Sequence, residues 1–235
     1  MLIEPPIRSR RGAQAFDDRA RVAALRLWGA VLLGVFVLLA GVTMAKALKS
    51  PDQALDDSLN RFALSHSWIT DFLKAATQAG EPTVALGVGL LAAVAFYLLR
   101  MRASAYFAAA SVIGAYGIAY VAKEIVHRHR PRWDAVHTVV SDTGSSFPSG
   151  HATGSSALAT VLIVAAVPLL TSLAARRAAV IVLALYVLTM LVSRPILGVH
   201  FPTDVFSGAV LGTGWALVCA SVLRPWQVQR REAAP

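Results

Sequence analysis

Long apolar runs dominate the pattern of this chain. Six of them have no charged residue at their centres and reach or approach the roughly 20 residues that a helix needs to cross a hydrocarbon core about 30 Å thick. They predict an all-α, polytopic membrane protein, a bundle of six transmembrane helices. The fifth run is the shortest, and an extension through Pro195 toward Val199 is an alternative boundary. The six predicted spans are 27–45, 82–99, 103–122, 152–170, 178–193 and 205–223.

Between the first two runs, residues 46–80 are mostly polar but carry apolar side chains at helical spacing. Leu55, Leu59 and Phe62 form one such set, and a second begins at Ile69. Helical spacing of apolar residues in a polar segment predicts short amphipathic helices that lie on the bilayer surface or cap the bundle. A packed loop is the alternative. We therefore predict a basic arm at 1–26, a membrane domain at 27–223 and a tail at 224–235.

Composition agrees with a membrane protein. Apolar residues make up 56% of the chain and charged residues 15%, whereas soluble domains carry about 25% charged residues. An ordinary water-soluble enzyme and a disordered chain are both excluded, since disorder requires low hydrophobicity. The single cysteine, Cys219, lies within an apolar run, so no disulfide framework is predicted within one chain.

The net charge of +9 would suggest nucleic-acid binding in a soluble protein, but its distribution favours a membrane. Of the 22 basic residues, 13 fall in the N-terminal arm, the tail and the short links after the second and fourth runs. Cytoplasmic segments next to spans are enriched in lysine and arginine. We therefore predict both termini in the cytoplasm, with segments 46–80, 123–151 and 193–204 facing outward.

The segments that are predicted to face outward contain basic and other polar residues that the predicted orientation does not explain. Charged residues are missing from the middle of the predicted spans, which weakens a transporter or channel interpretation. Lys123 and Arg130 are separated by about two helical turns and precede Pro131, so both cations can reach one anion. Taken alone, such a cluster is also typical of a lipid-headgroup contact.

Two further motifs flank the fourth and sixth runs. Pro148-Ser149-Gly150-His151 opens the fourth run, where a hydroxyl, a glycine backbone and the first helical N–H groups form an anion site. The stretch from Arg194 to Asp204 includes His200, four residues before the carboxylate. A carboxylate at that spacing can accept an imidazole N–H and leave the other ring nitrogen free to attack. A helix cap is the structural alternative for each motif.

In this order, Lys-x6-Arg-Pro, Pro-Ser-Gly-His and Ser-Arg-x5-His-x3-Asp resemble the three-part signature of the type 2 phosphatidic acid phosphatase and vanadium haloperoxidase superfamily. Every signature position is matched between residues 123 and 204. The resemblance implies a phosphate cradle in which three cations bind the phosphate oxygens and a serine with a glycine backbone completes the site. These residues are Lys123, Arg130, Arg194, Ser149 and Gly150.

The resemblance also implies the catalytic roles. His200 is expected to be the nucleophile that forms a phosphohistidine, Asp204 its orienting partner, and His151 the acid that protonates the leaving oxygen. Family enzymes need no metal, so we expect no metal and no other cofactor. Three cations around a phosphoryl group offset the charge that a metal offsets in other phosphotransferases. The haloperoxidase relatives are soluble, so this chain resembles the phosphatase branch.

The function predicted from these features is an integral membrane phosphatase of the cytoplasmic membrane. Its substrate would be a lipid-linked phosphate or diphosphate, such as a polyprenyl diphosphate, phosphatidic acid or phosphatidylglycerol phosphate. We expect membrane lipids as its partners, and no nucleic acid. A phosphotransferase that uses an alcohol acceptor is an alternative, because it shares the phosphohistidine. A non-catalytic lipid-phosphate-binding protein or transporter is a second alternative, against which the intact His200, Asp204 and His151 argue.

Overall fold

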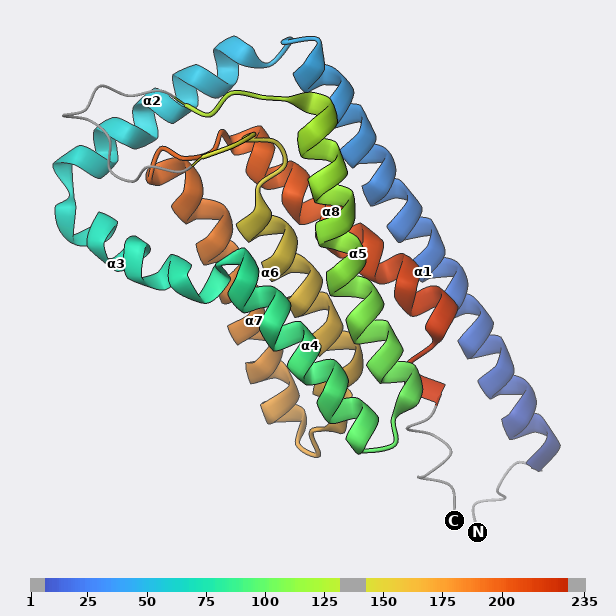
Figure 1. Ribbon diagram of the computed structural model, residues 1–235. Coiled ribbons are helices and arrows are strands. Elements are labelled where there is room, and N and C mark those ends of the chain that lie inside the picture. Colours follow the sequence, from blue (N-terminus) through green and yellow to red (C-terminus); the bar gives the residue numbers. More distant parts are fainter. Residues whose placement is uncertain (1–6, 132–142, 228–235) are drawn as a thin grey trace.

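The computed structural model describes residues 7–131 and 143–227, and this part of the chain is helical with connecting loops (Figure 1). Two short helices lie between the first and second spans in the sequence. The α-helices are α1 (Ile7–Met44), α2 (Lys49–Ser65), α3 (Ser67–Thr77), α4 (Pro82–Leu98), α5 (Arg102–Val126), α6 (Gly150–Val161), α7 (Leu173–Ile196) and α8 (Pro202–Leu223).

The predicted membrane bundle is confirmed. Within the described residues, five helices are long and apolar enough to cross a membrane, namely α1 from Asp17, α5, α6 extended to Leu169, α7 and α8. The remaining prediction, the second span at 82–99, corresponds to α4, which has 17 residues and joins α3 through a 3₁₀ turn and a 40° bend. The fifth span extends beyond the predicted end at residue 193, because α7 continues through Pro195 to Ile196.

Two boundaries differ from simple helical runs. Helix α1 is unbroken from Ile7, within the predicted arm, to Met44 at the end of the first span; residues 1–6 and 228–235 lie outside the described residues. The predicted fourth span changes form within its length, since a π-helical turn at Leu162–Ala166 and a 3₁₀ turn at Val167–Leu169 follow α6. Pro168 lies in that last turn, where proline lacks the N–H that would continue an α-helix. The predicted division into arm, membrane domain and tail stays a prediction.

Helix α8 is the central element of the bundle. It packs along α1 on one side and along α6 on the other. Gly208 and Gly212 face α6 so closely that a Cβ at either position would meet the α6 backbone, at Ser149 and Thr153. The two glycines therefore bring the first turn of α6 directly against the start of α8, and this contact joins the second and third sequence motifs.

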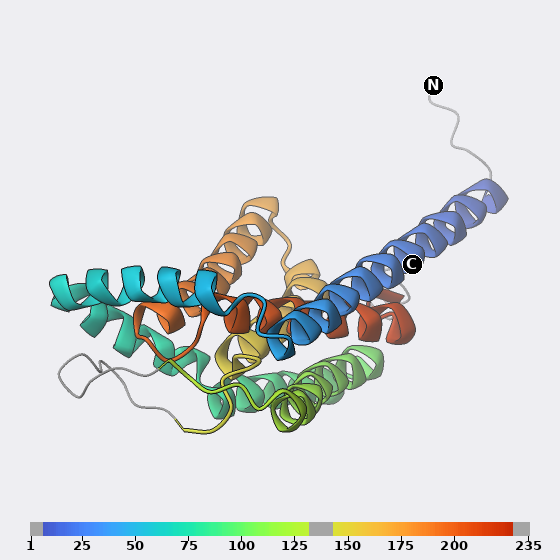
Figure 2. The ribbon, with the colours of Figure 1, turned by 90° about the horizontal axis from the view of Figure 1, so that it is seen from above.

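The amphipathic helices α2 and α3 lie across one end of the bundle and extend together to one side (Figures 1 and 2). We call this end the site end; the start of α1 and the α4–α5 and α6–α7 links lie at the opposite end (Figure 1). Helix α2 turns its polar face inward, with Asp52, Asp56 and Asn60 buried, while Leu55 is 50% exposed. Phe62 is also exposed, whereas Leu59 is half-buried and packs against a buried cluster that includes Leu197 and Val199. The apolar positions of α2 are therefore divided between the surface and the bundle, and both predicted roles, on a bilayer surface or as a cap, stay predictions.

Candidate active site

A cavity of about 380 Å³ opens at the site end, and residues from all three sequence motifs line it. The first motif contributes two cations, one from α5 and one from the segment after it. The second motif contributes the first turn of α6. The third motif contributes the end of α7 and the loop that follows it. A wall from α3 and the turn before α4 closes another side. The lining residues are Lys74, Thr77, Gln78, Glu81, Pro82, Lys123, Arg130, Gly150, His151, Arg194, Leu197 and His200.

Six of the eight predicted site residues thus share one cavity, and the other two lie behind it. Ser149 and Asp204 are both fully buried, and the Ser149 amide donates to the Asp204 carbonyl over 3.0 Å. The motifs are separated by up to 80 positions in sequence. Their convergence follows from the close packing of α6 on α8, which sets the PSGH segment beside the loop that carries His200.

His200 lies in the loop between α7 and α8 and is 1% exposed. Its Nε2 is 3.1 Å from Nη1 of Arg130. Arginine carries only donors, so Nε2 accepts this hydrogen bond and its lone pair points toward the cation. Burial, the dominant cause, lowers the pKa of His200 to about 4, against an opposing effect of Asp204. The imidazole is therefore neutral at physiological pH, as a nucleophile must be.

The predicted contact between His200 and Asp204 is indirect. Nδ1 of His200 lies 3.8 Å from Oδ2 of Asp204, beyond hydrogen-bonding distance, but 3.2 Å from Oγ of Ser146. The Ser146 hydroxyl donates to the same Oδ2. With Nε2 accepting from Arg130, Nδ1 carries the proton and donates it toward Ser146. The orienting role assigned to Asp204 thus passes through a hydroxyl that sequence reasoning missed.

Two of the three cations that are predicted to bind phosphate donate hydrogen bonds to backbone carbonyls near the cavity. Nζ of Lys123 donates to the Ser145 carbonyl over 2.6 Å, and Arg130 donates to the carbonyls of Gly144 and Val199 over 3.2 and 2.9 Å. Arg194, near the end of α7, is 4% exposed. These contacts fix the positions of the positive groups before any anion binds, which is the arrangement that electrostatic catalysis requires.

The first turn of α6 supplies donors of a different kind. Ser149 precedes the helix, and its buried hydroxyl has no hydrogen-bond partner among the described residues. Buried hydroxyls are normally paired, so this one suits a ligand oxygen. Gly150 lines the cavity, and a Cβ there would lie 3.1 Å from the ring of Pro82. The glycine lets the helix N-terminus, with its outward N–H groups, approach the cavity closely.

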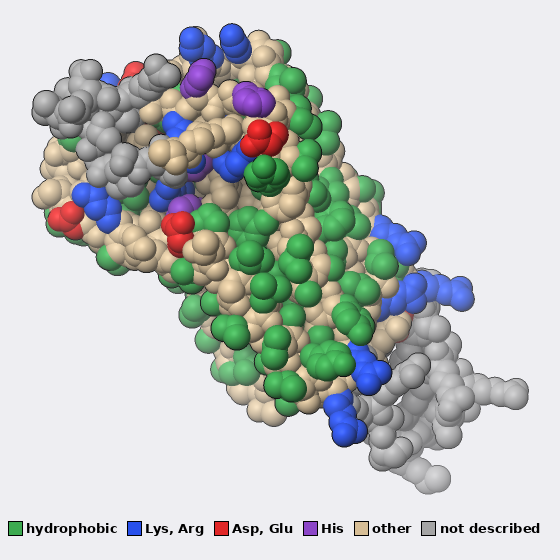
Figure 3. Space-filling model, in the orientation of Figure 1, with side chains coloured by type: hydrophobic (Ala, Val, Ile, Leu, Met, Phe, Trp, Pro, Cys, Tyr) green, Lys and Arg blue, Asp and Glu red, His purple; other side chains and the backbone are tan. Residues whose placement is uncertain are grey.

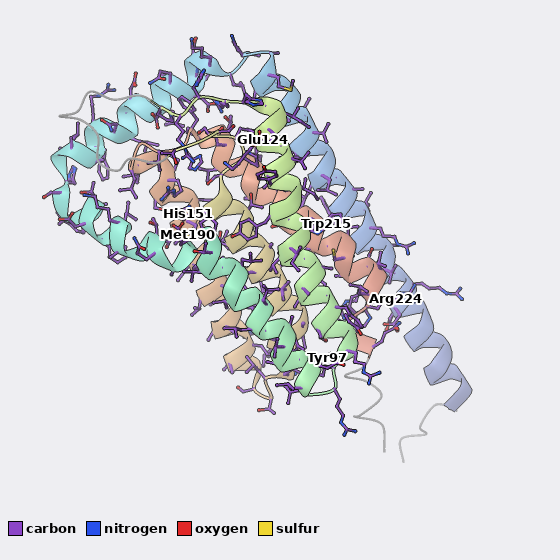
Figure 4. The ribbon with its side chains drawn as sticks, in the orientation of Figure 1. Tyr97, Glu124, His151, Met190, Trp215 and Arg224 are labelled. Atoms are coloured by element: carbon purple, nitrogen blue, oxygen red, sulfur yellow. The ribbon has the colours of Figure 1, made fainter. Side chains whose placement is uncertain are left out.

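His151 has a partner that the sequence did not reveal. Its Nε2 lies 3.2 Å from a carboxylate oxygen of Glu81, the residue just before α4. The imidazole is nearly buried, whereas Glu81 is half exposed and lines the cavity. Figure 4 places His151 at the start of α6, beside the region where α3 meets α4. Glu81 can therefore hold a proton-bearing Nε2 in a fixed direction.

Arg128, which lies between the two predicted cations of the first motif, holds Asp204 in place. Its Nη1 donates to Oδ1 of Asp204 over 2.7 Å and to Oγ1 of Thr203 over 2.6 Å, and its Nη2 to Oδ2 of Asp52 over 2.6 Å. The guanidinium stacks 4.1 Å from the ring centroid of Phe201. The Phe201 amide donates to Oδ2 of Asp204 over 3.0 Å, so both carboxylate oxygens of Asp204 have donors.

Helix α2 enters this network through Asp52. The carboxylate accepts from the amide of Thr203 over 3.3 Å and from its hydroxyl, in the first turn of α8, in addition to Arg128. An acid at a helix N-terminus is favoured by the helix dipole. The segment 46–80 thus supplies a buried carboxylate that links the start of α8 to Arg128. This contact gives a structural reason for the arginine at position 128, which the distribution of basic residues across the membrane does not explain.

A metal requires several ligands in one place. Within residues 7–131 and 143–227, no three His, Cys, Asp or Glu side chains gather as a metal site would need. The expectation that catalysis needs no metal or other cofactor stays a prediction.

Comparison with known proteins identifies relatives for this arrangement. A model of the PAP2 superfamily matches residues 104–227, which contain all three motifs. Two relatives are named decaprenylphosphoryl-5-phosphoribose phosphatase. One, from Mycobacterium tuberculosis, is 35% identical over 57% of this chain and 69% of its own length. The other, from Mycolicibacterium smegmatis, is 37% identical over 52% of this chain and 61% of its own length.

A solved structure shares the fold. It is described as the first transmembrane PAP2 type phosphatidylglycerolphosphate phosphatase from Bacillus subtilis, and the TM-score is 0.68 at 22% identity. The match covers 86% of this chain and 96% of that one. The similarity therefore extends over nearly the whole bundle, including the segments before the first motif.

Proposed function

The chain belongs to the PAP2 superfamily, and on that basis we propose that it hydrolyses a lipid-linked phosphate through a phosphohistidine on His200. One observation carries the proposal: the neutral, buried imidazole presents the lone pair of Nε2 to Arg130 in a cavity that also holds Lys123 and Arg194. A nucleophile at the centre of three cations is the arrangement that phosphoryl transfer uses to attack an anionic substrate.

The first step forms a bond between Nε2 of His200 and phosphorus while the bond from phosphorus to the leaving oxygen breaks. His151 gives its proton to that oxygen, which departs as an alcohol or a phosphate. Charge on the equatorial oxygens is offset by the three cations, with the Ser149 hydroxyl as a further donor. The imidazole becomes positive as the bond forms, and the relay through Ser146 to Asp204 stabilises it.

The second step returns the enzyme to its starting state. A water molecule attacks phosphorus on the side that the leaving group vacated, and His151, now unprotonated, takes a proton from it. The bond between phosphorus and Nε2 breaks, and inorganic phosphate leaves with His200 neutral again. Glu81, at 3.2 Å from His151, holds the imidazole in the direction needed for both proton transfers.

For the substrate we infer a lipid whose phosphate is attached to a polar headgroup. The relatives are named for a phosphate on a ribose that is linked to a polyprenyl chain, and the fold neighbour for phosphatidylglycerolphosphate. The cavity here has a matching polar wall, formed by Lys74, Thr77 and Gln78 at the end of α3. Hydroxyl, amide and ammonium groups suit a sugar or glycerol headgroup better than an alkyl chain.

We also propose that the site end faces outward and the opposite end faces the cytoplasm. The arginines of the α4–α5 and α6–α7 links lie at the end opposite the cavity, together with those near the start of α1. The positive-inside tendency supports that orientation. The enzyme would then act on lipid phosphates exposed at the outer surface of the cytoplasmic membrane.

Separate variants of the two histidines test the chemistry. In His200→Ala we expect no turnover of any substrate and no acid-labile phosphoenzyme after rapid quenching. In His151→Ala, activity toward an aryl phosphate should survive in part, because phenolate leaves readily, while activity toward an alkyl lipid phosphate should fall by roughly 10²–10⁴-fold. A phosphoenzyme that persists in His200→Ala, or equal losses across leaving groups in His151→Ala, would contradict the proposed roles.

A further inference from the structure

A second cavity, of about 540 Å³, lies at the site end on the other side of the segment that follows α5. It is bounded by the end of α1, the start of α2 and residues 126–131, with Phe201 as its contact with the loop before α8. Arg130 lines this cavity and the active-site cavity. The two cavities are therefore neighbours that share one wall, and no part of the proposed reaction uses the second.

The charged residues that line this second cavity are all basic. Its lining includes Lys46, Lys49, Arg128 and Arg130 together with two histidines, 127 and 129, and among the described residues no aspartate or glutamate lines it. Figure 3 shows basic and histidine side chains gathered over the start of α2 and the end of α5. A concave surface that carries one sign of charge concentrates ions of the opposite sign.

The four cations are not equivalent. Arg128 is bound by Asp52 and Asp204, and Arg130 by backbone carbonyls and His200. Lys46 and Lys49 are exposed and form no ion pair within the described part of the chain. Both lie at the end opposite the basic links, so membrane orientation gives no reason for them. Their charge is therefore available to an anion from outside the chain.

The rest of the lining indicates the chemistry of that anion. Thr43 and Gln53 add hydroxyl and amide groups, and Met44, Leu48 and Val126 add apolar surface where α1 and α5 reach the end of their spans. The ends of membrane-spanning helices lie close to the headgroup phosphates of a bilayer. Lysine clusters at that depth bind phosphate headgroups through their charge.

We propose that this cavity is a second phosphate site, distinct from the catalytic cradle, with Lys46 and Lys49 as its principal ligands. The phosphate is carried by the headgroup of an anionic membrane lipid or is free phosphate. Bound there, it offsets the positive charge next to residues 127–131, the segment that supplies Arg128 to Asp204 and Arg130 to the cradle. Occupancy therefore stabilises the site end of the folded protein.

The test measures thermal stability of the purified full chain in a neutral detergent, with the catalytic cradle saturated by vanadate. One arm adds phosphatidylglycerol and compares it with phosphatidylcholine; the other adds inorganic phosphate and compares it with chloride at equal ionic strength. Each arm uses the wild type, the double variant Lys46→Gln/Lys49→Gln, and the control Arg61→Gln. Arg61 is an exposed cation of α2 outside the cavity.

At roughly ten times the dissociation constant, the ligand should raise Tm by about 3 °C in the wild type and in Arg61→Gln, and by less than about 1 °C in the double variant. A rise with phosphatidylglycerol alone identifies a lipid headgroup as the ligand, and a rise with phosphate alone identifies the free ion. Equal rises in the wild type and the double variant, or no rise in either arm, would overturn the proposal. Phosphatase activity is assayed separately, so failure of the second site leaves the proposed reaction untouched.

Discussion

Asp56 is a buried carboxyl group that no cation of the described residues contacts directly. Its side chain on α2 is fully buried, and neither carboxylate oxygen has a hydrogen-bond partner in that part of the chain. Burial, followed by the negative charges of Asp57, Asp204 and Asp52, raises the pKa of Asp56 from 3.8 to about 7, and Arg128 opposes this only in part. The folded protein therefore retains a proton on Asp56 that the unfolded chain loses near pH 4.

This difference determines how folding stability depends on pH. Between about pH 4 and pH 7 the folded state binds more protons than the unfolded state, so the free energy of unfolding falls as pH rises through that window. A pKa that moves from 3.8 to about 7 corresponds to about 4 kcal/mol above pH 7, and screening by nearby water reduces this to roughly 2–4 kcal/mol. Asp56→Asn, which resembles the protonated acid and cannot ionise, should avoid this loss.

We therefore expect Asp56→Asn to unfold at a higher temperature than the wild type at about pH 8, by roughly 4–16 °C for a chain of this size. The difference should become small near pH 4, where the wild-type carboxyl is protonated in the folded state and about half protonated in the unfolded chain. Thermal unfolding of both proteins in detergent, followed by intrinsic fluorescence from pH 4 to 8, measures it. Asp71→Asn, at an exposed carboxylate of α3, is the matched control and should show no such trend. A difference in Tm that is constant with pH would refute the reasoning.

Three further predictions concern the site and its orientation. Asp52→Asn should lower kcat about 10- to 100-fold with little change in KM, because Arg128 then loses the carboxylate that aligns it with Asp204; steady-state kinetics beside Asp71→Asn measures this. In a Cys219→Ser background, a cysteine at Ala54 should react with an impermeant thiol reagent in intact cells and one at Ala174 should not; the reverse would invert the topology. Activity should survive excess chelator and be inhibited by vanadate; restoration by a divalent metal after chelation would contradict the cation cradle.

Sequence patterns predict the bundle and much of the site for physical reasons that are local. A span requires a long apolar run wherever it lies in the chain, and each signature motif is a short segment at one helix end, so its members stay together after folding. The residues that the sequence missed act across distance. Ser146 and Glu81 contact His200 and His151 through loop and helix packing, and nothing next to either residue in sequence marks that contact.

Helix α2 shows a limit of predictions from apolar spacing. The spacing of Leu55, Leu59 and Phe62 defines an apolar face, and in a water-soluble protein that face turns toward the core. In α2 only Leu59 of this set packs on the bundle, Leu55 and Phe62 are exposed, and the polar side chains of Asp52 and Asp56 are buried. Apolar spacing therefore separates the two faces of such a helix without specifying which of them meets protein. The carboxylate that holds Arg128 is one of these buried polar groups, and its ion pair with that arginine offsets the cost of burying it.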